Sequence, residues 1–143
     1  MKTLNQLSVF LENKVGQLSQ VCRTLAAANV SLVALSIAET PDFGIARLIV
    51  DDCAKATEAL RKAKYIVKST PVVAVEVPNV PGGMAQVVAT LSEKGCDIEY
   101  SYAFAASPAE KAVLVFRFKE TDKVEAVLAE AGLTTVDESG IKA

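Results

Sequence analysis

Apolar and polar residues alternate along the chain in the pattern of short strands separated by amphipathic helices. Residues 5–12 place Leu7, Val9 and Leu11 at every second position, which is the period of a strand with one buried face. Residues 17–28 then carry apolar side chains three and four positions apart, the spacing of one helix face. These side chains are Leu18, Val21, Cys22 and Leu25. A strand followed by a helix is therefore expected at the start of the chain.

The rest of the first half predicts a hairpin, a second helix and a closing strand. The expected strands cover 30–39, 45–50 and 65–67, and the expected helix covers 54–63 after Asp51 and Asp52, which are suited to cap it. The second half repeats this order. Its expected strands lie near 72–77, 97–105, 112–119 and 133–137, and its expected helices near 83–94 and 122–131.

The two halves align with each other as copies of one unit. Residues 7–32 match 73–98 without a gap when the chain is shifted by 73 − 7 = 66 positions. The strand period and the helix period both stay in register over this stretch, which is hard to obtain by chance. The identical pairs include Asn13 and Asn79, Gly16 and Gly82, Gln20 and Gln86, and Thr24 and Thr90. The sequence therefore predicts an internal duplication.

The duplication predicts two domains, 1–70 and 71–143, with 68–71 as the link between them. Farther along, Leu48 matches Phe116 at 116 − 48 = 68, so two extra residues are expected near 106–110. Each copy has the order β-α-β-β-α-β. Right-handed crossovers place both helices on one face of a four-stranded antiparallel sheet, so the fold class is α+β with two ferredoxin-like units.

Histidine is absent from all 143 residues, which removes the catalytic triads and zinc sites that depend on it. The three cysteines have no Cys-x-x-Cys spacing, so neither a metal site nor a disulfide framework is indicated. Cys22 and Cys96 fall at packing positions. Cys53 follows two carboxylates that oppose activation of its thiol. We therefore expect no catalytic residue, no metal and no cofactor.

The charge balance argues against two further classes of partner. There are 15 Lys and Arg residues and 17 Asp and Glu residues, a net charge of −2, which lacks the basic character of a nucleic-acid binder. No apolar run is long enough to cross a bilayer, and the polar start of the chain is unlike a signal peptide. A cytoplasmic protein that binds neither nucleic acid nor membrane is expected.

The turn after the first strand of each copy carries the most informative residues. Both turns have the form Asn-x-(Val/Pro)-Gly-x-(Leu/Met). They are Asn13, Lys14, Val15, Gly16, Gln17 and Leu18 in the first copy, and Asn79, Val80, Pro81, Gly82, Gly83 and Met84 in the second. A glycine before a helix lets a ligand approach the first amide groups, which favour a carboxylate. The alternative is that Asn and Gly only form a tight structural turn.

With these turns, the whole chain resembles the ACT-domain family of regulatory modules, in particular its stand-alone tandem members. The first copy departs from the family pattern at Lys14 and Val15, where proline is common. The resemblance implies a free amino acid as ligand, a regulated enzyme as partner and an allosteric role. It also implies that each glycine turn faces the second strand of the other copy.

Carried onto this sequence, the resemblance implies two unequal ligand sites. One combines Asn13 to Leu18 with Asp97 and Ile98, and the other combines Asn79 to Met84 with Ser31 and Leu32. Asp97 can pair with the ammonium group of a ligand, whereas Ser31 can only form a neutral hydrogen bond. Lys14 could reach an acidic substituent, and the glycine pair in the second copy gives more room.

Side-chain parity along the strands predicts where each sheet is apolar. In the first copy, the face away from the helices is expected to be an exposed apolar patch, formed by Phe10, Val33, Leu35, Ile37, Ile45 and Ile49. Such a patch marks an interface, so a twofold homodimer through this face is expected. The second copy is expected to be polar there, with Glu76, Asp97, Glu99, Ser101 and Arg117, and its core is expected to hold Tyr100, Tyr102 and Phe104.

Three functions remain compatible with these observations. The first is an amino-acid-binding regulatory protein. The second is a structural subunit that has lost ligand binding, and the third is a small ferredoxin-like enzyme using Asp97, Glu99 or Cys53. The lack of histidine and of a compact acid–base pair disfavours the enzyme. The sequence does not identify the amino acid, the number of ligands or the regulated pathway.

Overall fold

The computed structural model describes residues 2–105 and 110–141, and these residues form two compact units. The first unit spans Asn5–Thr70, and the second spans Pro71–Ala143 together with the first residues of the chain. The insertion expected near 106–110 lies largely outside the described residues. The ferredoxin-like fold expected for each copy is confirmed in both units.

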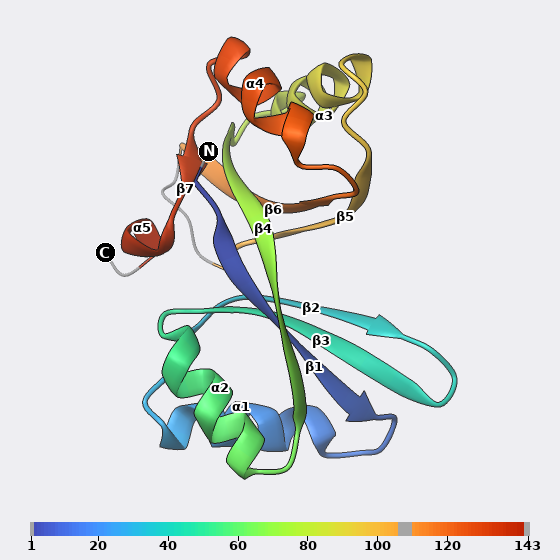
Figure 1. Ribbon diagram of the computed structural model, residues 1–143, viewed down its shortest axis with the longest axis vertical. Helices are drawn as coiled ribbons and strands as arrows, with labels where there is room; N and C mark the ends of the chain where they lie inside the picture. Colours follow the sequence, from blue (N-terminus) through green and yellow to red (C-terminus); the bar gives the residue numbers. More distant parts are fainter. Residues whose placement is uncertain (1, 106–109, 142–143) are drawn as a thin grey trace. The chain divides into compact units, whose positions relative to one another are not determined.

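The first unit is a four-stranded antiparallel sheet with two helices on one face (Figure 1). The strand order is β2-β3-β1-β4, so β2 lies at one edge. The elements are β1 (Leu4–Glu12), α1 (Gln17–Ala27), β2 (Leu32–Glu39), β3 (Phe43–Val50), α2 (Cys53–Lys62) and β4 (Ile66–Pro78). As predicted, Asp52 caps α2: its carboxylate accepts a hydrogen bond of 3.1 Å from the backbone N–H of Lys55.

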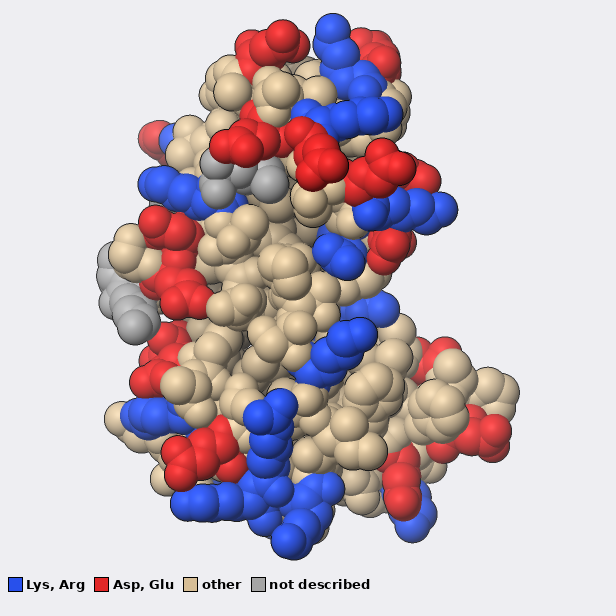
Figure 2. Space-filling model, viewed as in Figure 1, with Lys and Arg blue, Asp and Glu red and all other residues tan. Residues whose placement is uncertain are grey.

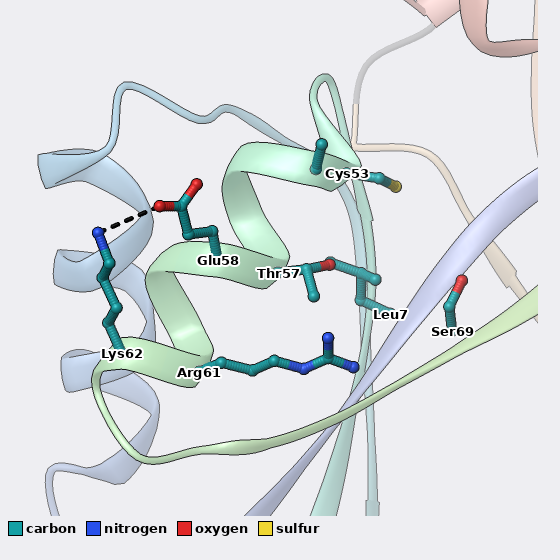
Figure 3. Close-up of a pocket in the computed structure, with 8 residues that line it drawn as sticks. Leu7, Cys53, Thr57, Glu58, Arg61, Lys62 and Ser69 are labelled. Carbon is teal, nitrogen blue, oxygen red and sulfur yellow. Dashed lines mark ion pairs between the residues drawn. The ribbon is translucent and has the colours of Figure 1, made fainter.

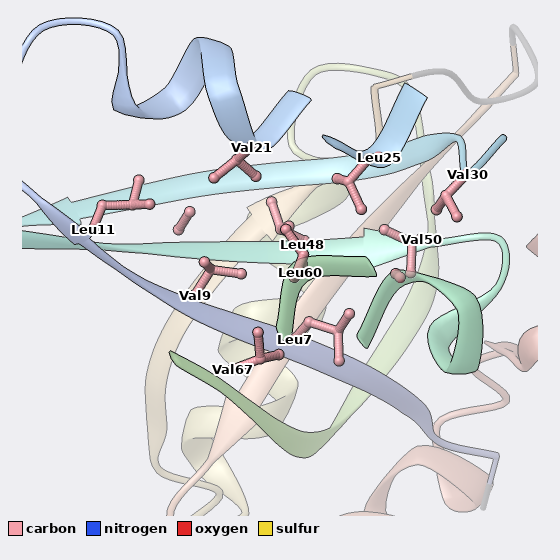
Figure 4. Packing of buried hydrophobic residues seen from close by; sticks show 12 residues of the cluster. Leu7, Val9, Leu11, Val21, Leu25, Val30, Leu48, Val50, Leu60 and Val67 are labelled. Atoms are coloured by element: carbon pink, nitrogen blue, oxygen red, sulfur yellow. The ribbon is translucent and has the colours of Figure 1, made fainter. Parts of the chain in front are cut away.

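The core of the first unit lies between this sheet and its two helices (Figure 4). Leu7 and Val9 of β1 pack with Val21 of α1 and Leu60 of α2, and all four are almost completely buried. These are the positions that the alternating and helical periods single out. The amphipathic pattern therefore accounts directly for the layer of helices on the sheet.

The second unit repeats the arrangement with a different closing segment. β6 lies between β4 and β5, and the short β7 pairs with the other side of β4. Its remaining elements are α3 (Gly83–Glu93), β5 (Ile98–Ala103), β6 (Lys111–Phe118), α4 (Asp122–Glu130), β7 (Thr135–Val136) and α5 (Glu138–Ile141). The core packs Val75 and Phe116 of the sheet against Leu91 of α3 and Leu128 of α4.

The predicted link between the copies at 68–71 contains the boundary between the two units, but these residues continue a strand and do not interrupt it. β4 runs without interruption from Ile66 to Pro78 and contributes its first half to the first unit and its second half to the second. Pro71 lies where β4 passes from the first unit to the second. One element therefore serves both as the last strand of one copy and as the first strand of the next.

A β-bulge in β2 overturns part of the predicted apolar patch. The pairing of β2 with β3 shifts between Leu32 and Ala34, so Val33 is the extra residue. Beyond the bulge, Leu35 lies opposite Leu48, a core residue on the helix-facing side of the sheet. A shift of one residue moves every later side chain to the other face. Leu35 and Ile37 therefore lie on the helix-facing side, contrary to the prediction.

The same bulge recurs at the matching position of the second copy. The pairing of β5 with β6 shifts between Ile98 and Tyr100, which makes Glu99 the extra residue. Ser101 then lies opposite the core residue Phe116, on the helix-facing side, and not on the open face as predicted. The aromatic residues Tyr100 and Tyr102 lie opposite Arg117 and Val115 on the open face, so their predicted core position is wrong.

The sheet faces that point away from the helices are less exposed than the sequence predicts. The faces of the two units also resemble each other more closely than predicted. In the first unit Ile49 is only 1% exposed and Ala34 is equally buried, whereas Phe10 is 38% exposed, so only part of the predicted patch is free. In the second unit the open face contains the buried residues Ala74 and Val115 beside the predicted Glu76. The burial of Ile49 leaves less apolar area for a homodimer through the open face of the first copy, which stays a prediction.

We predict that Gly83→Ala destabilises the fold by about 1–3 kcal/mol, the usual cost of overpacking. Gly83 is buried at the start of α3, and a Cβ atom there would overlap the backbone carbonyl of Pro78. The measurement is urea-induced unfolding of both proteins. Gln17→Ala is the matched control, since Gln17 holds the same place in the first copy and already carries a side chain. Equal stability of Gly83→Ala and the parent would contradict this packing.

Candidate functional site

Both glycine turns place a glycine at the N-cap of a helix. Gly16 and Gly82 are left-handed, with φ of 90° and 83°, and each stands directly before a helix. Each of these glycines is the N-cap residue of its helix, and glycine has no side chain with which to cap α1 or α3. The first turn of such a helix has backbone N–H groups that lack partners within the helix. These groups carry the partial positive charge of the helix dipole. Both turns can therefore bind a small anion such as a carboxylate.

The surroundings of the two turns are open. A Cβ atom on Gly16 or Gly82 would meet no atom within 4 Å. Val15 and Val80, which lie in the same turns, are large apolar side chains left exposed. Gly83 is different, because the carbonyl of Pro78 fills the space beside it. The extra room predicted from the glycine pair is therefore not there, and only the first glycine leaves space for a ligand.

Two polar residues of the first turn have partners within their own unit. The side-chain amide of Asn13 donates a hydrogen bond of 3.4 Å to the carbonyl of Pro41, in the hairpin between β2 and β3. The ammonium of Lys14 lies 2.7 Å from the carboxylate of Glu12, which raises the pKa of Lys14 and lowers that of Glu12. In the second turn, the backbone N–H of Asn79 donates to the carbonyl of Glu110.

The two strand starts expected to contribute to the sites also differ. The backbone N–H of Ser31 donates a hydrogen bond of 2.9 Å to the carboxylate of Asp51. In the second copy, the carboxylate of Asp97 is exposed and lies 3.3 Å from the ammonium of Lys119. Of the two, only Asp97 adds a negative charge at the edge of the helix layer, where a ligand ammonium could reach it.

The second unit brings its own turn and strand together around one cavity. This cavity of about 430 Å³ lies between α3 and β5, and both Met84 of the turn and Asp97 at the strand start line it. Cys96 and Ser101 also line it, and burial raises the pKa of the Cys96 thiol. The sequence analysis did not assign Ser101 to a site, because only the bulge turns this side chain inward. The cavity lies within a single unit, whereas the resemblance suggested a turn of one copy with a strand of the other.

A second cavity of about 680 Å³ lies in the first unit beside α2, and the sequence analysis missed it (Figure 3). Figure 3 shows the guanidinium of Arg61 on the same side of the helix as Thr57, facing Ser69 of β4. Lys62 pairs with Glu58 on the other side of the helix at 3.1 Å. A guanidinium and two hydroxyls can hold an oxyanion.

The signal for this cavity is the charge of residues 55–68, which contain five basic side chains and one acidic side chain, Glu58. Figure 2 shows basic side chains gathered at the end of α2.

The first turn borders a third cavity, of about 400 Å³, through Gln17. In it, the hydroxyl of Tyr65 donates to the side-chain oxygen of Gln20 at 3.2 Å.

The described residues contain no group of histidine, cysteine, aspartate and glutamate side chains that could hold a metal ion. In the part of the chain that the structure describes, no helix is long and apolar enough to cross a membrane.

Comparison with known proteins agrees with this architecture. The protein BT0572 from Bacteroides thetaiotaomicron is 42% identical, with a TM-score of 0.90 over 97% of this chain and 95% of that one. The ligand-free regulatory subunit of aspartate kinase from Thermus thermophilus is 16% identical, with a TM-score of 0.66 over 92% of this chain and 91% of that one. The regulatory subunit of aspartate kinase from Thermus flavus is also 16% identical, with a TM-score of 0.62 over 92% of each chain.

These last two similarities show a shared fold. No curated protein matches the chain in sequence. The family description that matches is ACT domain pair, and the match covers residues 2–143. With two ferredoxin-like units and a glycine turn in each, the chain belongs to the family of ACT domain pairs.

Proposed function

We propose that this ACT domain pair is a regulatory protein that binds a free amino acid and acts on a partner enzyme, without catalytic activity of its own. The observation that carries the proposal is the repeated glycine turn. In each unit it places a glycine at the N-cap of a helix beside open space, as Gly16 and Gly82 show. Such a helix start favours the carboxylate that every amino acid carries.

The comparisons support a regulatory role. The structures from the two Thermus species are regulatory subunits of aspartate kinase, and the fold match covers 91% and 92% of those chains. A subunit of this kind transmits a signal only if its ligand binds two arrangements with different affinity. We accordingly propose a cytoplasmic protein whose partner is an enzyme. The pairing of each glycine turn with the strand of the other copy remains a prediction.

We also propose that the chain forms a homodimer, but through the edge strand β2 and not through the open sheet face. β2 is the last strand of its sheet, so one row of its backbone groups has no strand partner in the described sheet. Leu35 and Ile37 on this strand are 39% and 44% exposed, although both are large and apolar. Apolar side chains along an unpaired edge favour pairing with a second chain.

Gly82→Ala is expected to weaken amino-acid binding. The new methyl group lies where a ligand would approach the first turn of α3, and Gly82 has the positive φ that disfavours alanine. A thermal-shift screen with the twenty amino acids identifies the ligand. At about 100 times its Kd, that ligand adds roughly 2.7 kcal/mol to the stability of the parent protein. Calorimetric titration of the ligand then compares the parent with the variant.

Gly132→Ala is the matched control for this prediction. Gly132 also has a positive φ, of 68°, and open space beside it, but it follows α4 and lies outside both glycine turns. Both variants lose about 1 kcal/mol of stability through backbone strain, while only Gly82→Ala loses affinity. If no amino acid shifts the melting temperature of the parent, the proposed function is wrong and the structural subunit is favoured. Turnover of a bound amino acid would instead favour the enzyme.

Ile37→Lys is expected to convert the dimer into a monomer, because a charged side chain would have to be buried against the second chain. Sedimentation velocity over a range of protein concentrations measures the change. Ile66→Lys is the control, since Ile66 is an equally large apolar side chain that is even more exposed and lies on β4 instead. A parent protein that sediments as a monomer throughout would refute the dimer.

A further inference from the structure

The cavity beneath α3 has apolar walls and a few polar groups. Its apolar walls include Val88 of α3, Ile98 of β5 and Phe116 of β6. Its polar lining residues include Ser92, Asp97 and Ser101. All of these residues belong to the second unit. An apolar pocket with a few polar groups is the usual form of a small-molecule site.

The hydroxyl of Ser101 is the unusual group in this cavity. The Oγ atom is buried and has no hydrogen-bond partner among the described residues. Burying a hydroxyl without a partner costs free energy, and most buried polar atoms in folded proteins are paired. The hydroxyl is nevertheless held there by the bulge at Glu99, which directs Ser101 to the helix-facing side. A ligand that supplies the missing hydrogen bond accounts for this arrangement.

The first unit provides an internal comparison, because its bulge lies at the equivalent position. Val33 is the extra residue there, and the chain shift of 99 − 33 = 66 is that of the duplication. The residue that matches Ser101 is Leu35, which lies opposite Leu48 just as Ser101 lies opposite Phe116. A leucine in place of this serine fills space and removes the hydroxyl.

The other walls show which features of the cavity differ between the copies. The apolar residues have apolar counterparts: Leu18 for Met84, Cys22 for Val88, Val30 for Cys96, Leu32 for Ile98 and Leu48 for Phe116. The polar residues of the cavity have less polar counterparts in the first copy. Ala26 matches Ser92, Ser31 matches Asp97 and Leu35 matches Ser101. At this place the second copy therefore has hydrogen-bonding groups that the first copy lacks or has only in weaker form.

We infer that the chain binds one amino acid, in the second unit, with the ligand side chain in the cavity beneath α3 and hydrogen-bonded to Ser101. This inference rests on the proposed function and adds to it the position, the number and the class of the ligand. The first turn of α3 takes the carboxylate, and Asp97 at the cavity rim takes the ammonium. The first unit has Leu35 in place of Ser101 and therefore lacks the hydroxyl that an equivalent ligand would need.

The cavity selects the ligand by polarity as well as by size. Ser101 offers a donor and an acceptor, so it favours a side chain with a neutral hydrogen-bonding group. The inner walls Val88, Ile98 and Phe116 offer no opposite charge, so a charged side chain would lose its hydration without compensation. A purely aliphatic side chain would leave the hydroxyl unpaired. The expected class is a small amino acid with a neutral polar side chain.

Pairs of amino acids of nearly equal shape test this class directly. Calorimetric titrations compare threonine with valine, and asparagine with leucine, on the intact protein. The polar member of at least one pair is expected to bind about tenfold or more tightly than its apolar counterpart, at one molecule per chain. Equal affinity within both pairs, or two molecules per chain, would overturn the inference while leaving amino-acid binding intact.

Two substitutions at Ser101 separate the roles of volume and hydroxyl. Ser101→Ala keeps the space and removes the hydroxyl, so the preference for the polar member of the pair is expected to fall to about twofold or less. Ser101→Leu reproduces the first copy and is expected to raise the Kd of every bound amino acid by about tenfold or more. The matched control Leu35→Ala alters the equivalent place in the first unit and should bind as the parent does.

The melting temperature measured without ligand distinguishes a loss of binding from a failure to fold. If Ser101 is kept for binding, Ser101→Ala loses an unpaired buried hydroxyl, and its melting temperature equals or exceeds that of the parent. A lower melting temperature would show that the hydroxyl stabilises the fold, and would overturn the inference. If no amino acid binds the parent at all, the proposed function fails together with this inference. Binding that Ser101→Leu leaves unchanged overturns the inference alone.

Discussion

A one-residue bulge in the second strand of each copy sets the orientation of every later side chain on that strand. In an antiparallel pair, one inserted residue exchanges the two faces for every residue that follows it. The bulges at Val33 and Glu99 therefore decide which side chains reach the helix layer. They turn Leu35 inward in one copy and Ser101 inward in the other. The same backbone irregularity thus places a leucine on the helix-facing side of one copy and a serine beside a cavity in the other.

Divergence between the copies follows the same logic beyond this strand. The cavity beside α2 has Thr57, Arg61 and Ser69 on its lining. A shift of 68 positions places Glu125, Ala129 and Asp137 at the matching positions of the second copy. A site able to hold an oxyanion in one copy is thus replaced by an acidic surface in the other. The core positions that support the two surfaces, such as Leu60 and Leu128, stay apolar because both folds need them.

The sequence predicted the fold well because the fold depends on local periods. The alternation of Leu7, Val9 and Leu11 and the helical spacing around Val21 need no knowledge of which strands pair. The bulges could not be predicted this way, since residues 30–39 are apolar at both parities and no glycine or proline marks the extra residue. The continuous β4 was missed for a similar reason. Lys68 to Pro71 has the composition of a linker, and only its place in both sheets makes it a strand.

The candidate site was predictable only where its chemistry lies in the backbone. Gly16 and Gly82 are visible in the sequence because a left-handed turn before a helix requires glycine. Ser101 has no such signature, because its importance comes from being buried without a partner. A polar group of this kind lowers stability, and a fold keeps it when a ligand restores the missing hydrogen bond. The first copy, where a leucine takes this place, shows that the scaffold itself does not require the serine. The unpaired hydroxyl is therefore a property of the site and not of the fold.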